Sequence, residues 1–171
     1  RIFNEDVTPT LTYNSEHAHP HLSFPLHVTQ LNTTTTPDFV EVQIFAGTAP
    51  NPTTLKATKT WPGSEWPSGQ TTTRRITMSY DAINDSTGMW FYRIKIANVY
   101  GATRVEWPGA ITGTRNLVNR SQSPFGAGWW LSGLEEIKTT WPGDATQRLW
   151  IGGDGSTRLF NTSYVNLYDR R

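Results

Sequence analysis

The chain has 171 residues, a length that suits one domain or one domain with a smaller appended piece. Its net charge is +1 and its Lys and Arg residues are scattered, which argues against the clustered basic face of a nucleic-acid-binding protein. The absence of cysteine excludes disulfides and thiolate metal sites, and no segment approaches the length of a membrane span.

Alternation of apolar and polar residues with a period of two predicts β-strands along the first two-thirds of the chain. The clearest run is Trp90–Ile96, in which Arg93 and Lys95 alternate with aromatic and aliphatic residues. In chain order the predicted strands are 11–13, 22–31, 40–45, 75–80, 90–96 and 102–107. Short strands separated by Pro, Gly and Asn turns indicate an antiparallel β-sandwich over residues 1–113, with the first strand opening its sheet.

A second piece is predicted over residues 114–171, because the composition changes across residues 112–122 in the manner of a connector. Within it, the run 148–160 predicts a β-hairpin whose Asp154 and Gly155 form a tight type I′ turn. This extension is too short to bury a core alone, so we expect it to pack on the sandwich.

The motif Ser123-Pro-Phe-Gly-Ala-Gly-Trp-Trp130 combines glycines with adjacent indoles. Gly126 and Gly128 allow a sharp turn and a close approach to a neighbour. Trp129 and Trp130 point to opposite faces if they lie in a strand, and we expect Trp129 to be the buried anchor of a rigid corner that joins two cores. The predicted structural motif comprises Ser123, Pro124, Phe125, Gly126, Gly128, Trp129, Trp130, Asp154 and Gly155.

Several runs resemble known families. Tyr92–Gly101 resembles the sixth strand and following turn of fibronectin type III and related immunoglobulin-like domains, which implies such a fold for the sandwich. Thr8–Pro20, Asn119–Ile137 and Leu149–Phe160 resemble, in this order, the leading β-sandwich, the shell-entry segment and the following hairpin of RHS (YD-repeat, teneurin-like) proteins.

The RHS resemblance implies a structural role. Such proteins, polymorphic toxins among them, build a hollow β-shell from Tyr-Asp repeats around a C-terminal effector, and the domains before the repeats close or buttress that shell. This chain has no run of the repeats, since Tyr168-Asp169 is a single dipeptide. The resemblance therefore implies a leading sandwich with the first shell strands, secreted or on the cell surface of a bacterium. Its partner would be the remainder of its own polypeptide, as expected for a chain that begins with Arg1.

Carbohydrate binding is the alternative function. Secreted β-sandwiches bind glycans through exposed aromatic rings, and a cell-surface glycan would then be the partner. The candidate platform residues are Trp61, Trp66, Trp107 and Trp141, each followed by proline. The competing structural interpretation is that these indoles cover the edges of the sheets.

Other chemistry has less support. His17, His19 and His21 alternate, which would place three imidazoles on one strand face as weak metal-ligand candidates. Pro20 disturbs that strand and the sequence identifies no groups that would orient the rings, so we expect no cofactor. No carboxylate pair with a supporting pattern, serine elbow or phosphate loop is present, and we expect no catalytic activity.

Overall fold

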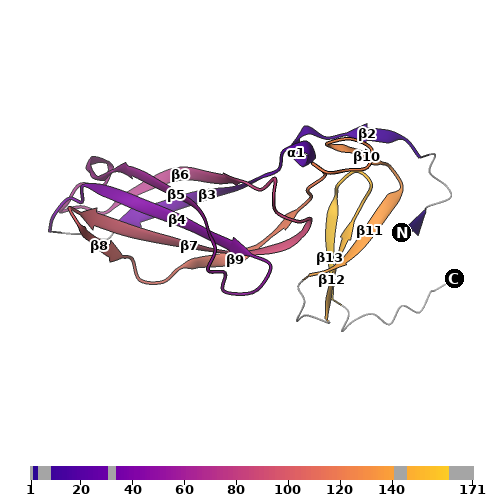
Figure 1. Cartoon of the computed structure of the whole chain (residues 1–171). Coiled ribbons are helices and arrows are strands. Elements are labelled where there is room, and N and C mark those ends of the chain that lie inside the picture. Colours follow the sequence, from indigo (N-terminus) through magenta and orange to yellow (C-terminus); the bar gives the residue numbers. More distant parts are fainter. Residues whose placement is uncertain (1, 4–8, 31–33, 141–145, 162–171) are drawn as a thin grey trace. The chain divides into compact units, whose positions relative to one another are not determined.

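A computed structural model of the chain describes residues 2–3, 9–30, 34–140 and 146–161 (Figure 1). These residues form antiparallel sheets with almost no helix, which confirms the predicted all-β class. In chain order the elements are β1 (Ile2–Phe3), β2 (Leu11–Tyr13), α1 (Ser15–Ala18), β3 (His21–Gln30), β4 (Phe39–Gly47), β5 (Leu55–Pro62), the 3-10 helix η1 (Gly63–Glu65), β6 (Thr72–Asp81), β7 (Gly88–Tyr100), β8 (Thr103–Glu106), β9 (Ile111–Leu117), β10 (Trp129–Leu131), β11 (Leu134–Thr139), β12 (Gln147–Ile151) and β13 (Thr157–Asn161). Neither helix in the described part of the chain is long and apolar enough to cross a membrane.

The chain divides into two compact units. The terminal unit comprises residues 1–21, 81–90 and 116–171, and the central unit comprises residues 22–80 and 91–115. This division differs from the predicted boundary at 113/114, which assigned the first two segments of the terminal unit to the sandwich. The difference arises because those segments make their contacts with the C-terminal part of the chain, a long-range relation that local composition does not encode.

The central unit buries the apolar faces of two sheets. One has the strand order β5-β4-β7-β8, with β9 also paired to β7, and the other consists of β3 and β6. Val40, Val42 and Ile44 of β4 are fully buried, as their alternation predicts, and each such side chain contributes roughly 1.5–3 kcal/mol. The ring of Phe24 in β3 lies 4.9 Å from the ring of Tyr92 in β7, so side chains of the two sheets meet.

The terminal unit contains a four-stranded sheet of order β1-β11-β12-β13 and a ribbon of β10 and β2. Leu149 and Ile151 are almost completely buried and cluster with Val118. Strand β2 was predicted to open the sheet of the sandwich, but it pairs with β10 instead, placing Thr12 opposite Trp130. The alternation of a three-residue strand cannot reveal its partner.

The hairpin of β12 and β13 forms as predicted, but its turn is of a different type. A type I′ turn needs positive φ at both central residues, whereas only Gly155 has one, at +86°. Gly155 N donates to Gly152 O at 2.9 Å, and Gly152 N donates to Ser156 O at 2.9 Å. The loop is therefore a three-residue connection with a left-handed glycine. Asp154 Oδ1 accepts from Ser156 N at 2.9 Å and from Ser156 Oγ at 2.7 Å, which stabilises this longer turn.

Candidate functional site

The side chain of Arg120 binds the hairpin loop of the terminal unit. Arg120 is only 6% exposed, and its two terminal nitrogens donate to Gly153 O and Gly152 O, each at 2.9 Å. Its guanidinium also lies 4.6 Å from the centre of the Trp130 ring. Burial lowers the pKa of Arg120 from its ordinary value, and the negative charges of Glu136 and Asp154 oppose that shift. The group stays charged, and the carbonyls and the ring face compensate for its lost hydration.

The backbone of Arg120 holds two further segments. Its N–H donates to His17 O in α1 at 2.8 Å. Its carbonyl accepts from Ser123 N at 3.1 Å and from Gly128 N at 3.0 Å. One residue therefore fixes the N-terminal segment, the glycine motif and the hairpin loop.

Trp130, and not Trp129, is the buried anchor of the motif. Trp130 is 7% exposed, its Nε1 donates to Leu134 O at 3.0 Å, and the Phe125 ring meets it edge-on at 5.8 Å. Trp129 is 41% exposed and lies against Tyr13 across the β2–β10 ribbon. The two indoles do alternate as expected for a strand, but the inward side is the one that faces Arg120.

Two glycines of the motif and hairpin permit close packing. Gly128 has φ of +78°, and a Cβ there would lie 2.7 Å from Asn14 O. A Cβ on Gly155 would lie 1.9 Å from Cε1 of His17. The N-terminal segment can therefore lie against both turns only because these positions lack side chains.

Hydrogen bonds within the motif close its turns. Gly126 has φ of +102° and donates its N–H to Ser123 O at 3.0 Å. Ser123 Oγ donates to Trp129 O at 2.6 Å and accepts from Phe125 N at 3.2 Å. Pro124, between Ser123 and Phe125, is one of the residues that line an open groove in the terminal unit. The motif is a series of turns that leads into β10.

Asn119 binds the segment that precedes β7. Its Nδ2 donates to the carbonyls of Ala82, Ile83 and Asp85, at 3.3, 2.8 and 2.7 Å. Thr87 Oγ1 donates to Asn119 O at 2.9 Å. Adjacent residues Asn119 and Arg120 thus organise different parts of the terminal unit through backbone carbonyls.

An open groove of about 680 Å³ runs beside these residues in the terminal unit. Hydroxyl and amide groups from residues 84–87 and 119–123 line it, together with the Trp130 indole and the side chains of Glu136 and Lys138. Its lining mixes these polar groups with apolar side chains such as Ile83, Val118 and Ile151, and it belongs to the same network of turns.

The predicted tryptophan platform does not form as a set. Trp66 is fully buried and its Nε1 donates to Val28 O at 3.2 Å, so its ring cannot stack on a sugar. Trp61 and Trp107 are half-buried, and Trp107 Nε1 donates to Asn98 Oδ1 at 2.9 Å. These positions fit indoles that cover sheet edges. Trp141 lies outside the described residues, as does Tyr168-Asp169.

The three histidines do not share a strand face. Asn14 caps α1 through a 2.8 Å bond from Glu16 N to its Oδ1, and His17 lies on this helix. Burial and the charge of Arg120 lower the pKa of His17, which favours a neutral ring in the terminal unit. His19 and His21 lie near Asp81 instead.

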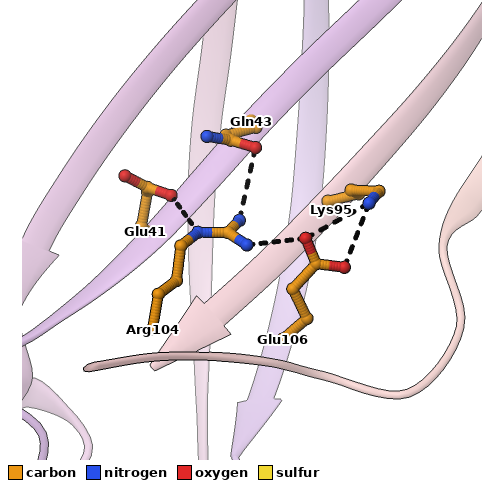
Figure 2. A network of polar contacts seen from close by, with 5 residues as sticks. All are labelled: Glu41, Gln43, Lys95, Arg104 and Glu106. Carbon is orange, nitrogen blue, oxygen red and sulfur yellow. Dashed lines mark hydrogen bonds and ion pairs between the residues drawn. The ribbon is translucent and has the colours of Figure 1, made fainter. Parts of the chain in front are cut away.

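The central unit carries a separate charged network on β4, β7 and β8 (Figure 2). Arg104 donates to Glu41 at 2.7 Å, to Gln43 at 3.2 Å and to Glu106 at 2.6 Å, and Lys95 pairs with Glu106 at 3.0 Å. The hydrogen bond from Arg104, followed by that from Lys95, lowers the pKa of Glu106. The side chains of Arg104 and Glu106 are 30% and 44% exposed, so the network suits a solvated sheet face.

Sequence reasoning assigned no site role to Arg120, Asn119 or Asp81. Arg120 and Asn119 occur in a polar connector, and nothing in that local pattern distinguishes a buried arginine from a solvated one. Their position directly before a glycine- and tryptophan-rich motif is the one usable signal, because tight turns expose carbonyls that need donors. Comparison with family models, curated proteins and solved structures yields no match.

Proposed function

We propose that this chain is a non-catalytic structural module whose terminal-unit sheet is continued by further strands of the same polypeptide. The observation that carries the proposal is a group of apolar side chains, Ile137, Trp150 and Phe160, on one face of this sheet, which they share with Arg148 and Arg158. Ile137 is 59% exposed and Phe160 is 47% exposed. Ile137 of β11 lies opposite Trp150 of β12. Trp150 in turn lies opposite Arg158 of β13, and Phe160 follows Arg158 by two residues. The side chains of Ile137, Trp150 and Phe160 therefore project from the same face of the sheet.

The order of the strands supports continuation at one particular edge. Strand β13 is last in the order β1-β11-β12-β13, and within the described residues it pairs only with β12. It also carries Leu159, which is 48% exposed. An edge strand with exposed apolar side chains is prone to pair with another strand. A following strand would extend the sheet by pairing with the edge of β13 that faces away from β12.

A sheet that is continued by further strands of the same polypeptide is what the RHS resemblance implies. We propose that the next strands are those of an RHS-like shell, and that the rigid turns around Arg120 support its first sheet. The central unit would be a fibronectin type III-like sandwich, in keeping with its seven strands β3–β9 in two paired sheets. The proposal includes a secreted or cell-surface location in a bacterium, which follows from the resemblance alone.

Co-expression tests this function. Residues 1–171 would be produced with the polypeptide encoded directly downstream in the same reading frame, as two separate chains. We expect the two to co-purify, and Ile137→Asp with Phe160→Asp to abolish co-purification. Val105→Asp is the matched control, because Val105 is a 49% exposed apolar residue on β8 of the central unit. Failure of the wild-type chains to associate, or equal loss with Val105→Asp, would contradict the proposal.

A further inference from the structure

His19, His21 and Asp81 bring three metal-ligand side chains together in the terminal unit. Each offers one ligand atom, and these atoms lie within 4.8 Å of one another. His19 Nε2 is 3.6 Å from Asp81 Oδ2, and the two imidazole rings are 4.9 Å apart. The side chains of His19 and Asp81 are 55% and 48% exposed, so a cation from solvent has direct access.

A backbone carbonyl fixes the tautomer of His21. Its Nδ1 lies 3.0 Å from His19 O, and a carbonyl oxygen only accepts hydrogen bonds. The proton of a neutral His21 ring therefore lies on Nδ1, which leaves the lone pair on Nε2. A histidine that ligates a metal through one nitrogen usually donates the other to a carbonyl or carboxylate in this way.

Backbone groups also position Asp81. Its Oδ1 accepts from Ile83 N at 2.9 Å, while its Oδ2 is the oxygen near His19. Between these residues, Ala82 N donates to Pro20 O at 2.8 Å. This bond holds the two chain segments side by side. The three ligand side chains are therefore brought together by backbone pairing that needs no metal.

The ligand set and its spacing fit zinc. Tetrahedral Zn²⁺ with bonds of about 2.0–2.1 Å places its ligand atoms roughly 3.3 Å apart. The 3.6 Å separation of His19 and Asp81 is close to that value, and exposed side chains can close the remaining gap by small rotations. Imidazole suits Zn²⁺, and a carboxylate with a water molecule completes a four-coordinate set.

We propose that His19, His21 and Asp81 form a Zn²⁺ site in which water is the fourth ligand. The cation would cross-link residues 19–21, where β3 begins, to Asp81 at the end of β6, which is far away in the sequence. His17 takes no part, because it lies on α1 against Gly155. The site does not depend on the structural function proposed above.

Calorimetric titration of the full chain with Zn²⁺ alone tests the site. We expect one Zn²⁺ per chain and a rise in melting temperature on binding. His21→Ala and Asp81→Asn should each weaken the affinity at least about tenfold. His27→Ala is the matched control, because His27 is an exposed histidine of the same strand, and its affinity should equal that of the wild type.

Several results would overturn the site. They are the absence of one-to-one binding, an unchanged affinity in Asp81→Asn, or an equal loss in His27→Ala. His19→Ala provides a second ligand variant if His21→Ala alters the apo-protein circular dichroism spectrum. Substitution with Co²⁺ adds a spectroscopic readout, since the intense visible absorption of four-coordinate cobalt should appear in the wild type and disappear in Asp81→Asn.

Discussion

The central and terminal units organise their chains by different means. In the central unit, long strands bury alternate aliphatic residues, and Val40, Val42 and Ile44 are inaccessible to solvent. In the terminal unit, the small aliphatic cluster around Leu149 is accompanied by a buried arginine. The first arrangement depends on apolar area, and the second depends on donors that reach backbone carbonyls.

This difference has a consequence for tolerance to substitution. Volume-conserving apolar changes are tolerated in a strand core because burial is not directional. Arg120 has two fixed acceptors, Gly152 O and Gly153 O, and no other side chain reproduces its planar pair of donors. The terminal unit should therefore be sensitive to chemical type as well as to size.

The largest expected effect separates the two adjacent indoles. Trp130→Ala should lower the free energy of unfolding by about 3–5 kcal/mol, because it removes a buried ring that stacks on Arg120. Trp129→Ala should lower it by only about 1 kcal/mol, because that ring is largely exposed. Urea unfolding of both variants measures the contrast. Equal losses would reject Trp130 as the anchor.

A glycine pair separates backbone strain from packing. Gly155 and Gly69 have similar φ values, +86° and +79°, but only Gly155 has a neighbour where a Cβ would lie. Gly69→Ala should cost about 1 kcal/mol from strain alone, and Gly155→Ala about 2–3 kcal/mol because His17 must also move. Thermal unfolding of the two variants gives the comparison. An equal cost would show that the contact with His17 contributes nothing.

Asp154 gives the hairpin loop a pH dependence. Hydrogen bonds from Ser156 Oγ and Ser156 N hold the pKa of this carboxyl below its ordinary value of 3.8. A depressed folded-state pKa stabilises the protein above the unfolded-state value, and this stability is lost as pH falls through the folded-state value. Asp154→Ala should therefore be less stable than the wild type near neutral pH, and the gap should narrow as the pH falls below 3.8 through the folded-state pKa. A gap that stays constant as the pH falls would contradict the assignment.

The smallest expected effect lies in the charged network of the central unit. Arg104→Ala should cost about 0.5–1 kcal/mol, because the side chains of Arg104 and Glu106 are partly solvated and such pairs are screened by water and salt. A double-mutant cycle with Glu41→Ala, measured at low and high salt, should show a coupling that declines with salt. A coupling independent of salt would indicate that the network is more buried than its exposure suggests.

Sequence patterns predicted the strands of the central unit well because their period-two alternation is a local record of burial. Val40–Phe45 and Trp90–Ile96 both lie within long strands with the expected inward residues. The same alternation placed Trp129 and Trp130 on opposite faces without showing which face is covered. That choice depends on the contact with Arg120, which lies in the connector just before the motif.

The turns and sites were harder to predict because non-local contacts decide them. The prediction of a type I′ turn at Asp154-Gly155 was wrong. The carboxylate of Asp154 accepts hydrogen bonds from Ser156, and the loop has three residues instead of two. His17 is separated from His19 and His21 because Asn14 starts the helical turn α1, which contains His17 and ends before His19. Asp81, at the end of β6, completes the cluster with His19 and His21. The spacing of the histidines cannot predict a ligand so far away in the sequence.

Amide hydrogen exchange of Arg120→Ala, measured by NMR, tests the central claim most directly. The variant leaves the carbonyls of Gly152 and Gly153 without their donors, so amides of β2, β10, β12 and β13 should exchange faster. Amides of β4, and those of β7 from residue 91 to residue 99, should keep their protection, because the central unit has its own apolar core. Unchanged exchange in the terminal strands, or equal acceleration in both units, would contradict the account.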